Sequence, residues 1–231
     1  MLYQTIARGG KVLIPAFAVG RTQALMYALR QLQRNQKLPE VPVYVDSPMA
    51  CNAMGIYQRH PECYDSKARH IFQAEGSLFA LDGYACLTSS EESKALNEKS
   101  EACVVIAASG MCEAGRILHH LDHGLGNPRN TVLIVGFQAE HTLGRKLVDG
   151  LHTVRVFGRE MEVRAEVKVL NGFSAHAGQQ ELAGYLERCR PVGPLFLVHG
   201  DVPRAEAFQK VLAAKGFPDV RIPTAGEEWK V

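Results

Sequence analysis

The chain has 231 residues, of which 46% are hydrophobic, enough for a substantial core in one large domain or two ordinary ones. Its 26 basic and 24 acidic residues leave a formal net charge of only +2, so nucleic-acid binding would need a local groove rather than a basic tail. Six cysteines without a CxxC pair argue against a zinc ribbon and a disulfide scaffold, and several lie in apolar patterns typical of buried thiols. The absence of a signal-type start and of a membrane-length apolar run predicts a cytoplasmic protein with no membrane partner.

Apolar runs alternate with helical patterns over residues 1–150, as expected for a parallel sheet flanked by helices. The runs that predict buried strands are residues 11–17, 41–45, 103–108 and 131–137. The first run leads into a helix predicted to end at about Arg34, with Arg21 in its first turn. Backbone N–H groups there favour an anion, and a guanidinium can bind a phosphate, but it can equally pair with a neighbouring carboxylate. Arg30, Arg34 and Lys37, at and beyond the other end of this helix, are interpreted as a solvated face rather than a binding patch.

Asp46, Ser47 and Pro48 follow the second run and form a helix-start signal, with proline at the first helical position and a side chain that caps free amides. Because the sequence shows no partner for Asp46, we favour this structural role over a catalytic or metal-binding one. Residues 51–80 predict helices with breaks at Pro61 and near Gly76. We expect them to cover the site.

Ser109, Gly110 and Met111 follow the third run and precede a helix predicted over residues 113–123. A small residue, a glycine that permits close backbone approach and successive N–H groups at a helix start are typical of a phosphate-binding loop, although this pattern is common in α/β proteins. The helix carries His119, His120 and His123. Because the HExxH glutamate is missing, we interpret these histidines as surface residues rather than metal ligands.

After Gly150 the pattern changes to that of a β-hairpin, with a turn at Gly158 and Arg159. We therefore predict a boundary here, with one domain over residues 1–150 and another over residues 151–231. The second domain ends with a helix predicted over residues 203–215 and a short strand near residues 220–222.

Two histidines, His176 and His199, each lie where a strand-like run gives way to a glycine-containing turn and a helix. Residues 195–198 form a continuous apolar run, which predicts a strand buried on both faces of a parallel sheet and followed directly by His199. Open α/β sheets bind ligands beyond the carboxyl ends of their strands, so an imidazole there is well placed to hold a metal or move a proton. A single such histidine is more often structural, but two at equivalent turns favour a shared site.

The segments FSAHAGQQEL and LVHGD resemble the C-terminal region of the β-CASP nucleases, RNA-processing enzymes of the metallo-β-lactamase fold that include RNase J and the nuclease subunit of the pre-mRNA 3′-end cleavage machinery. Four further segments agree in kind and order, GGKVLIPAFAVGRTQAL, VPVYVDSPMA, ASGMCEAGRILHHL and PRNTVLIVGFQAEHTLGR. The resemblance implies an α/β fold: a β-CASP domain with a mostly parallel sheet flanked by helices, then the C-terminal part of the metallo-β-lactamase αββα fold.

The same resemblance implies phosphodiester hydrolysis of single-stranded RNA, endonucleolytic or 5′-to-3′ exonucleolytic, with two Zn²⁺ ions in a complete site. His199 matches a zinc ligand. His176 matches a histidine near the scissile phosphate, as a proton donor or a hydrogen-bond donor. Ser109 and Gly110 match a loop that holds a nucleotide phosphate, and the resemblance favours RNA contact for Arg21.

The chain also departs from the family pattern, because it contains no HxHxDH cluster and no acidic segment resembling Glu-Ser-Thr-Tyr-Gly. We therefore interpret it as the C-terminal half of a longer enzyme, inactive in isolation. The alternative is a non-catalytic RNA-binding or assembly module. Core strands missing from such a half would leave apolar edges exposed, so we expect self-association, with a homodimer as one candidate assembly.

Overall fold

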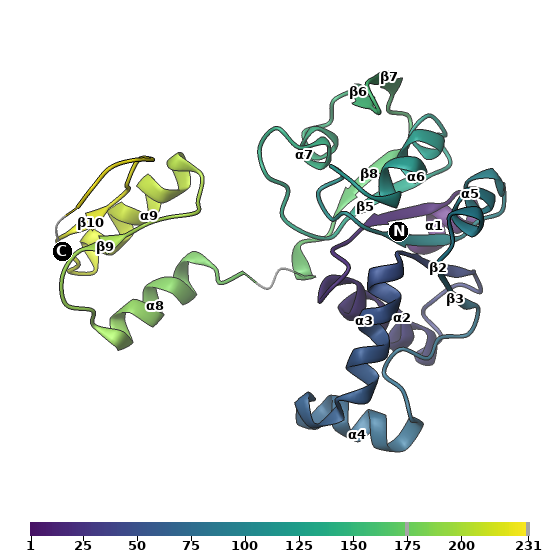
Figure 1. Cartoon of the computed structure of the whole chain (residues 1–231), viewed down its shortest axis with the longest axis horizontal. Helices are drawn as coiled ribbons and strands as arrows, with labels where there is room; N and C mark the ends of the chain where they lie inside the picture. The colour runs from purple at the N-terminus through teal and green to yellow at the C-terminus, as the bar shows by residue number, and fades with distance from the viewer. Residues whose placement is uncertain (174–175, 230–231) are drawn as a thin grey trace. The chain divides into compact units, whose positions relative to one another are not determined.

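A parallel sheet of six strands organises the first part of the chain (Figure 1). The structure is a computed structural model that describes residues 1–173 and 176–229. The strand order is β3-β2-β4-β1-β5-β8, and every neighbouring pair is parallel. The strands are β1 (Val12–Pro15), β2 (Val43–Asp46), β3 (Tyr84–Leu87), β4 (Val104–Ala107), β5 (Thr131–Ile134) and β8 (Glu166–Val169). The α/β class and the mostly parallel sheet expected from the sequence are confirmed.

Helices cover both faces of this sheet, which explains why its central strands read as unbroken apolar runs. Val12 and Ile14 point into one core with α2 and α3, whereas Leu13 points into a second core with α6 and α7. The helices are α1 (Leu2–Ala7), α2 (Arg21–Arg34), α3 (Pro48–Arg59), α4 (Ser66–Glu75), α5 (Ser90–Glu98), α6 (Arg116–Gly124) and α7 (Leu143–Val148), with a short 3₁₀ helix at Pro61–Cys63. The predicted α2 is confirmed, but Arg30 is 2% exposed, so its assignment to a solvated face is wrong, whereas Arg34 and Lys37 are exposed. Helix α6 begins a few residues later than expected.

Local sequence signals set several of the helix ends. The Ser47 hydroxyl accepts a hydrogen bond from the Ala50 N–H at 3.3 Å, and Pro48 occupies the first position of α3. The Asp65 carboxylate accepts one from the Ala68 N–H at 2.7 Å and caps α4. Gly76 ends α4 with a φ of 72°, a left-handed conformation that glycine adopts without steric cost. The helix breaks predicted at Pro61 and near Gly76 are confirmed.

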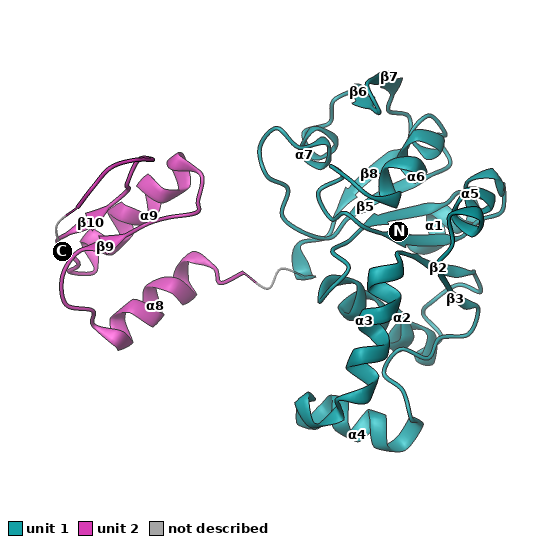
Figure 2. Cartoon of the chain, in the orientation of Figure 1, with its two compact units in different colours: residues 1–174 teal, residues 175–231 magenta. Residues whose placement is uncertain are grey.

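The predicted hairpin consists of β6 (Thr153–Val156) and β7 (Arg159–Glu162). The turn lies one residue earlier than predicted, because Arg159 begins β7 and the turn residues are Phe157 and Gly158, whose φ values of 50° and 77° suit a two-residue turn of type I′. The run that follows is not a continuation of the hairpin, because β8 pairs with β5 at the edge of the main sheet. By its contacts the chain divides into the units Met1–Ser174 and Ala175–Val231 (Figure 2). The boundary near residue 150 concerns family domains and stays a prediction.

The smaller unit contains α8 (Gln179–Cys189), β9 (Leu195–Phe196), α9 (Val202–Ala214) and β10 (Val220–Arg221). Its buried apolar residues are Ala183, Leu212 and Val220. The expectation of a strand over residues 195–198 buried on both faces is wrong. β9 has two residues, both half-buried, and Val198 is 70% exposed. Within residues 176–229, β9 pairs with β10 alone, so one of its edges has no neighbouring strand to bury it.

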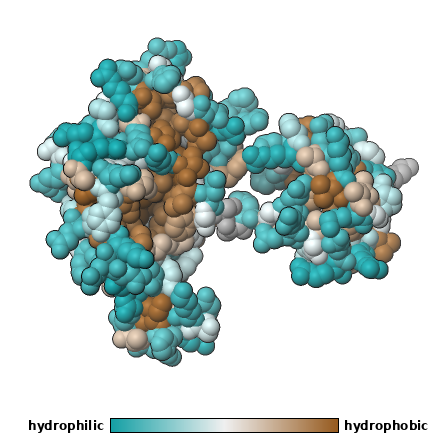
Figure 3. All heavy atoms as spheres, turned by 180° about the vertical axis from the view of Figure 1, so that it is seen from behind, coloured by the Kyte–Doolittle hydropathy of each residue, from teal (hydrophilic) through white to brown (hydrophobic). Residues whose placement is uncertain are grey.

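Apolar side chains are exposed in the larger unit where its strands end. Figure 3 shows a broad apolar area on this unit, seen from behind. Exposed apolar residues that follow or end the strands are Phe17, Val19, Met49, Phe137, Val169 and Leu170. Surfaces of this kind mark interaction sites. Self-association through them stays a prediction.

The cysteines differ from the expectation in one respect. Cys51 on α3 and Cys86 on β3 form a disulfide, with their Cα atoms 6.0 Å apart, whereas the cysteine pattern indicated thiols and argued against a disulfide scaffold. A fixed sequence spacing is not needed when tertiary structure brings a helix against an edge strand. Cys103 and Cys112 are buried thiols, and burial raises their pKa values to about 11 and about 12. Across residues 1–173 and 176–229, no helix has the length and apolarity needed to cross a bilayer.

Candidate nucleic-acid interface

The loop after β1 leads directly into α2 and places Arg21 at the carboxyl-end edge of the sheet. The Phe17 carbonyl accepts hydrogen bonds from the Thr22 N–H at 3.2 Å and the Thr22 hydroxyl at 2.9 Å, which fixes the first turn of the helix. The Arg21 guanidinium carbon lies 5.9 Å from the centre of the Phe173 ring. Its Nε atom is buried and has no hydrogen-bond partner in the described part of the chain, where no carboxylate pairs with Arg21 either. Arg21 therefore keeps a hydrogen-bond donor that no described residue uses.

The loop after β4 is closed by Ser109. Its hydroxyl oxygen accepts hydrogen bonds from the N–H groups of Glu113 and Ala114, both at 3.2 Å, and its own N–H donates to the Ala114 carbonyl at 2.9 Å. Gly115, with a φ of 78°, then turns the chain into α6. A Cβ atom on Gly115 would lie 2.4 Å from the Ala108 carbonyl oxygen. Ser109 thus shapes the loop.

Gly110 packs this loop against the end of β1. A Cβ atom at Gly110 would lie 2.9 Å from the Phe17 ring and 3.1 Å from the Phe17 nitrogen, so no larger residue fits without movement. The buried Gln138 amide donates to the Gly110 carbonyl at 2.9 Å and ties the loop to the end of β5. Among the described residues, the N–H groups of Gly110 and Met111 have no hydrogen-bond acceptor. The structure therefore brings Arg21, Ser109 and Gly110 to one edge, around Phe17.

Asp46, at the carboxyl end of β2, is fully buried and has three side-chain partners. Its oxygens lie 2.6 Å from Arg116 Nη1, 2.7 Å from His120 Nε2 and 2.5 Å from the donating Ser93 hydroxyl. Burial by itself raises the pKa of Asp46, but the hydrogen bonds from His120, Ser93 and Arg116 outweigh it and hold this pKa below its ordinary value. Asp46 is therefore a buried carboxylate anchored to α5 and α6.

Two expectations are corrected by this cluster. The cap of α3 is Ser47 rather than Asp46, because the Asp46 side chain points to α6 instead. His120 is not a surface residue: it is 3% exposed and contacts Asp46, whereas His119 and His123 are exposed as expected. Arg116 also donates to the Leu87 carbonyl at 3.1 Å. Arg116 is the first residue of α6, so its contact with Asp46 fixes the start of this helix. The loop with Ser109 and Gly110 leads into the same helix.

In the smaller unit, His199 lines a cavity of about 780 Å³. His199 is exposed, with a φ of 63°. The cavity is also lined by Ala177, the residue after His176, so the two turns expected to share a site lie in the same region. His176 itself is exposed. No group of three or more His, Cys, Asp or Glu side chains that could hold a metal is present among residues 1–173 and 176–229. A single imidazole does not make a four-coordinate zinc site.

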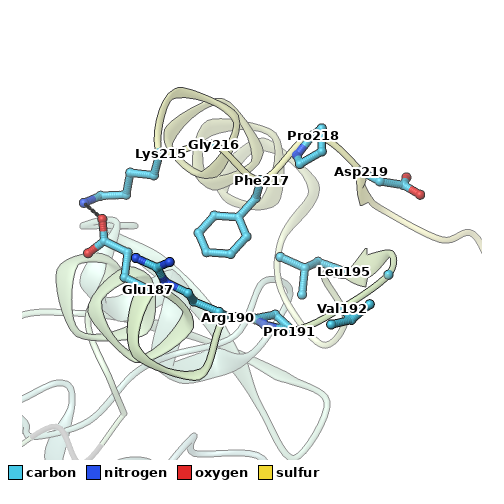
Figure 4. Close-up of a pocket in the computed structure, with 11 residues that line it drawn as sticks. Glu187, Arg190, Pro191, Val192, Leu195, Lys215, Gly216, Phe217, Pro218 and Asp219 are labelled. Carbon is cyan, nitrogen blue, oxygen red and sulfur yellow. Dashed lines mark hydrogen bonds and ion pairs between the residues drawn. The ribbon is translucent and has the colours of Figure 1, made fainter.

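A second cavity of this unit, of about 770 Å³, lies at the opposite ends of the strands (Figure 4). Phe217 and Leu195 form its wall, and Lys215 pairs with Glu187 at 2.8 Å on its rim. Ligands of α/β sheets bind beyond the carboxyl ends of the strands, whereas this cavity lies where β9 and β10 begin. We therefore do not assign it to the candidate interface.

Comparison with known proteins agrees with the fold. Residues 22–147 match the Beta-Casp domain, and residues 160–223 match the Zn-dependent metallo-hydrolase RNA specificity domain. The chain belongs to the β-CASP family. It is 40% identical over 227 residues to a ribonuclease of Thermus thermophilus, covering 98% of this chain and 51% of that protein. It is 35% identical over 204 residues to the transcription termination factor FttA of Methanosarcina mazei, and 28% identical over 221 residues to an RNase J-like protein of Methanocaldococcus jannaschii.

The β-CASP chain spans about half the length of the Thermus protein and of the RNase J-like protein, and 32% of FttA. Family membership, inferred above from short motifs, is confirmed. The roles of Arg21, Ser109, Gly110, His176 and His199 stay predictions, although the structure places the first three together. Asp46 and His120 were missed as a pair. One signal was available, since Arg116 and His120 are four residues apart and share a helix face.

Proposed function

We propose that this β-CASP chain binds and positions single-stranded RNA for a ribonuclease that hydrolyses phosphodiester bonds, of endonucleolytic or 5′-to-3′ exonucleolytic type. The observation that carries the proposal is the set of unsatisfied donors at the carboxyl-end edge of the sheet, from Arg21 Nε and the N–H groups of Gly110 and Met111. Arg21 Nε is buried, and a buried donor without an acceptor is costly, whereas the Gly110 and Met111 N–H groups are donors that the loop leaves unused. A phosphate oxygen is an acceptor that matches an arginine and a glycine loop.

The described residues do not supply the complete zinc centre that is expected for the family. His199 remains the proposed contribution of this chain, as one ligand, and further ligands would have to come from outside the described residues. His176 is proposed to donate a proton or a hydrogen bond to the phosphate, a role that suits imidazole. The alternative function, a non-catalytic RNA-binding or assembly module, is favoured by the missing ligand cluster. The nuclease and the RNA-binding module both require RNA binding at the same edge, whereas an assembly module does not.

The first test measures the affinity of the 231-residue chain for a fluorescent single-stranded RNA by anisotropy. Arg21→Ala should weaken binding about 10- to 100-fold, as expected for loss of a charge-assisted hydrogen bond. Lys37→Ala is the matched control, because it removes a positive charge just beyond the other end of α2. If the chain contacts RNA phosphates, added salt should lower its affinity for the RNA.

The affinities test the proposed interface, and a cleavage assay separates the two functions. Equal affinities of the Arg21→Ala and wild-type chains would contradict the proposed interface. If the edge binds RNA, a longer protein that supplies further zinc ligands should cleave it in a His199-dependent manner under the nuclease proposal. Binding without cleavage by such a protein would favour the non-catalytic module.

A further inference from the structure

A tyrosine-lined cavity lies outside the interface described above, between α2, α3 and the start of α4. Its volume is about 470 Å³, within the range of small-ligand pockets. Tyr27, Tyr57 and Tyr64 line it together with Phe79. Gly20 also lines it, and this glycine directly precedes Arg21. The cavity therefore reaches the chain position next to the candidate phosphate contact.

The aromatic walls of this tyrosine cavity are held in fixed orientations. The Tyr64 hydroxyl donates to the Tyr57 carbonyl at 2.7 Å. The Tyr57 and Phe79 rings pack edge to face with their centres 6.2 Å apart, and Phe79 is buried. Tyr64 packs in the same way against Phe72 at 5.6 Å. Rings that are already ordered lose little conformational entropy when a flat ligand packs on them.

The α4 side of the cavity is also anchored to the sheet-covering helices. Glu75 near the end of α4 forms ion pairs with Arg30 and Arg34 of α2, and the Arg30 side chain is buried. Arg69 donates to the Tyr64 carbonyl at 3.3 Å. These contacts connect α4 to α2 and to the segment that carries Tyr64, so the cavity belongs to the framework of the unit.

The polar groups of the cavity are few and mostly occupied. The Gln23 amide donates to the Ala18 and Ala50 carbonyls at 3.0 and 3.3 Å, and Asp65 caps α4. The exposed Lys67 is the cationic residue of the lining. Aromatic faces with a nearby cation and little free hydrogen-bonding capacity are typical of sequence-tolerant binding of single-stranded nucleic acid.

We infer that the tyrosine cavity is a base-stacking subsite, which holds one or two nucleobases of a single-stranded RNA whose backbone is bound next to it at Arg21. This inference rests on the proposed function and extends it from phosphate contact to base contact. Every base has a π-face, so the subsite accepts bases with little discrimination. Lys67 contacts a phosphate of the strand at the cavity mouth.

The test uses the 231-residue chain and RNA that carries 4-thiouridine, with ultraviolet crosslinking and mapping of crosslinked peptides by mass spectrometry. Crosslinks are expected at Tyr57 or Tyr64. In parallel, Tyr57→Leu should weaken RNA binding about 5- to 150-fold, the usual effect of losing one base-stacking ring. Tyr57→Phe keeps the ring and should bind as the wild type does. Tyr3→Leu removes another exposed tyrosine, on α1, and serves as the control.

An abasic RNA gives an independent readout. The wild-type chain should prefer the base-containing strand, and Tyr57→Leu should lose this preference. Binding that depends on Arg21 but is unchanged in Tyr57→Leu, without crosslinks in the cavity, would overturn the base-stacking subsite and leave the proposed function standing. Failure of the wild-type chain to bind RNA at all would overturn the proposed function and the subsite with it. Equal weakening by Tyr57→Phe and Tyr57→Leu would also reject stacking.

Discussion

The two units of the chain support their candidate functional residues in different ways. In the larger unit, Arg21 and Gly110 follow central strands that are buried on both faces. Asp46 binds Arg116 at the start of α6, the helix that follows the Gly110 loop. In the smaller unit, His199 follows a two-residue strand, and its neighbour Val198 is 70% exposed. Precise sites need side chains that are held by packing and by hydrogen bonds behind them. The loop with Ser109 and Gly110 is supported by packing and hydrogen bonds within its own unit. The turns with His176 and His199 have fewer such contacts.

The same contrast applies to stability. The larger unit contains two extensive apolar clusters, one on each face of the sheet, whereas the cluster of the smaller unit has three buried members. Burial of apolar surface supplies most of the favourable free energy of folding. We therefore expect the smaller unit to be the less stable one. Trp229 is the single tryptophan of the chain, and its ring centre lies 6.0 Å from that of Phe196 in the smaller unit, so its fluorescence reports on that unit.

The largest effect is expected from Asp46→Ala. This change leaves Arg116 and the buried His120 without their shared acceptor, and loss of one partner of a buried charged cluster costs about 3 kcal/mol or more in the free energy of unfolding. Urea unfolding followed by far-UV circular dichroism should show the loss. The Trp229 fluorescence transition should keep its midpoint, because that tryptophan lies in the other unit.

Asp65→Ala is the matched control for Asp46→Ala. It removes an exposed carboxylate that caps α4, and such caps contribute about 1 kcal/mol. If the two variants lose equal stability, Asp46 is not the anchor that its contacts indicate. A shift of the Trp229 transition in Asp46→Ala would instead show that the two units unfold together.

Leu212→Ala tests the smaller unit and should have the next largest effect. Leu212 is fully buried, and removal of a buried leucine side chain typically costs 2–5 kcal/mol, with the cost depending on how far the site collapses. The half-buried neighbours Leu186 and Phe208 leave room for collapse, so we expect about 2 kcal/mol. The Trp229 transition should move to lower urea, and the circular dichroism transition of the larger unit should not. The reverse pattern would contradict the division into separate units.

Much of the larger unit could be predicted from the sequence because its central strands are long apolar runs bounded by glycine and proline. The helix at Arg21–Arg34 and the break at Gly76 followed from such signals. The edge strand β3 and helix α5 did not stand out, since Tyr84–Leu87 is short and only half-buried. A capping box formed by Ser89 and Glu92 marks the start of α5 and was the available signal.

The candidate site was predictable only in part, for a physical reason. Arg21 and Gly110 belong to turns that can be recognised from the residues next to them in the sequence. The Asp46 cluster joins residues from β2, α5 and α6, and depends on β2 lying beside β4 in the sheet. Strand order is a property of the whole fold, so the spacing of Arg116 and His120 on one helix face does not by itself identify Asp46 as their partner. For the same reason, the exposure of Val198 was not visible in its apolar run.

The smallest predicted effect concerns acid and again distinguishes the units. Hydrogen bonds from Lys168 and Arg8 lower the pKa of Glu166, in the edge strand β8, to about 2. A carboxylate whose pKa is lower in the folded state stabilises the fold above its unfolded pKa and loses this contribution as the pH falls through the folded value. The window therefore runs from about pH 4.5 down to about pH 2. Because these side chains are partly exposed, the contribution should be about 1 kcal/mol.

The larger unit should lose about 1 kcal/mol less stability between pH 5 and pH 2 in the Glu166→Gln chain than in the wild type, as measured by urea unfolding followed by circular dichroism. Glu187→Gln is the control in the smaller unit, where Glu187 pairs with Lys215 and both side chains are exposed. It should leave the acid response of the larger unit unchanged. An acid response that is the same in the wild-type and Glu166→Gln chains would show that the bonds from Arg8 and Lys168 do not hold the edge strand. Attachment of β8 would then depend on its backbone pairing with β5 and on the apolar packing of Ala165 and Val167.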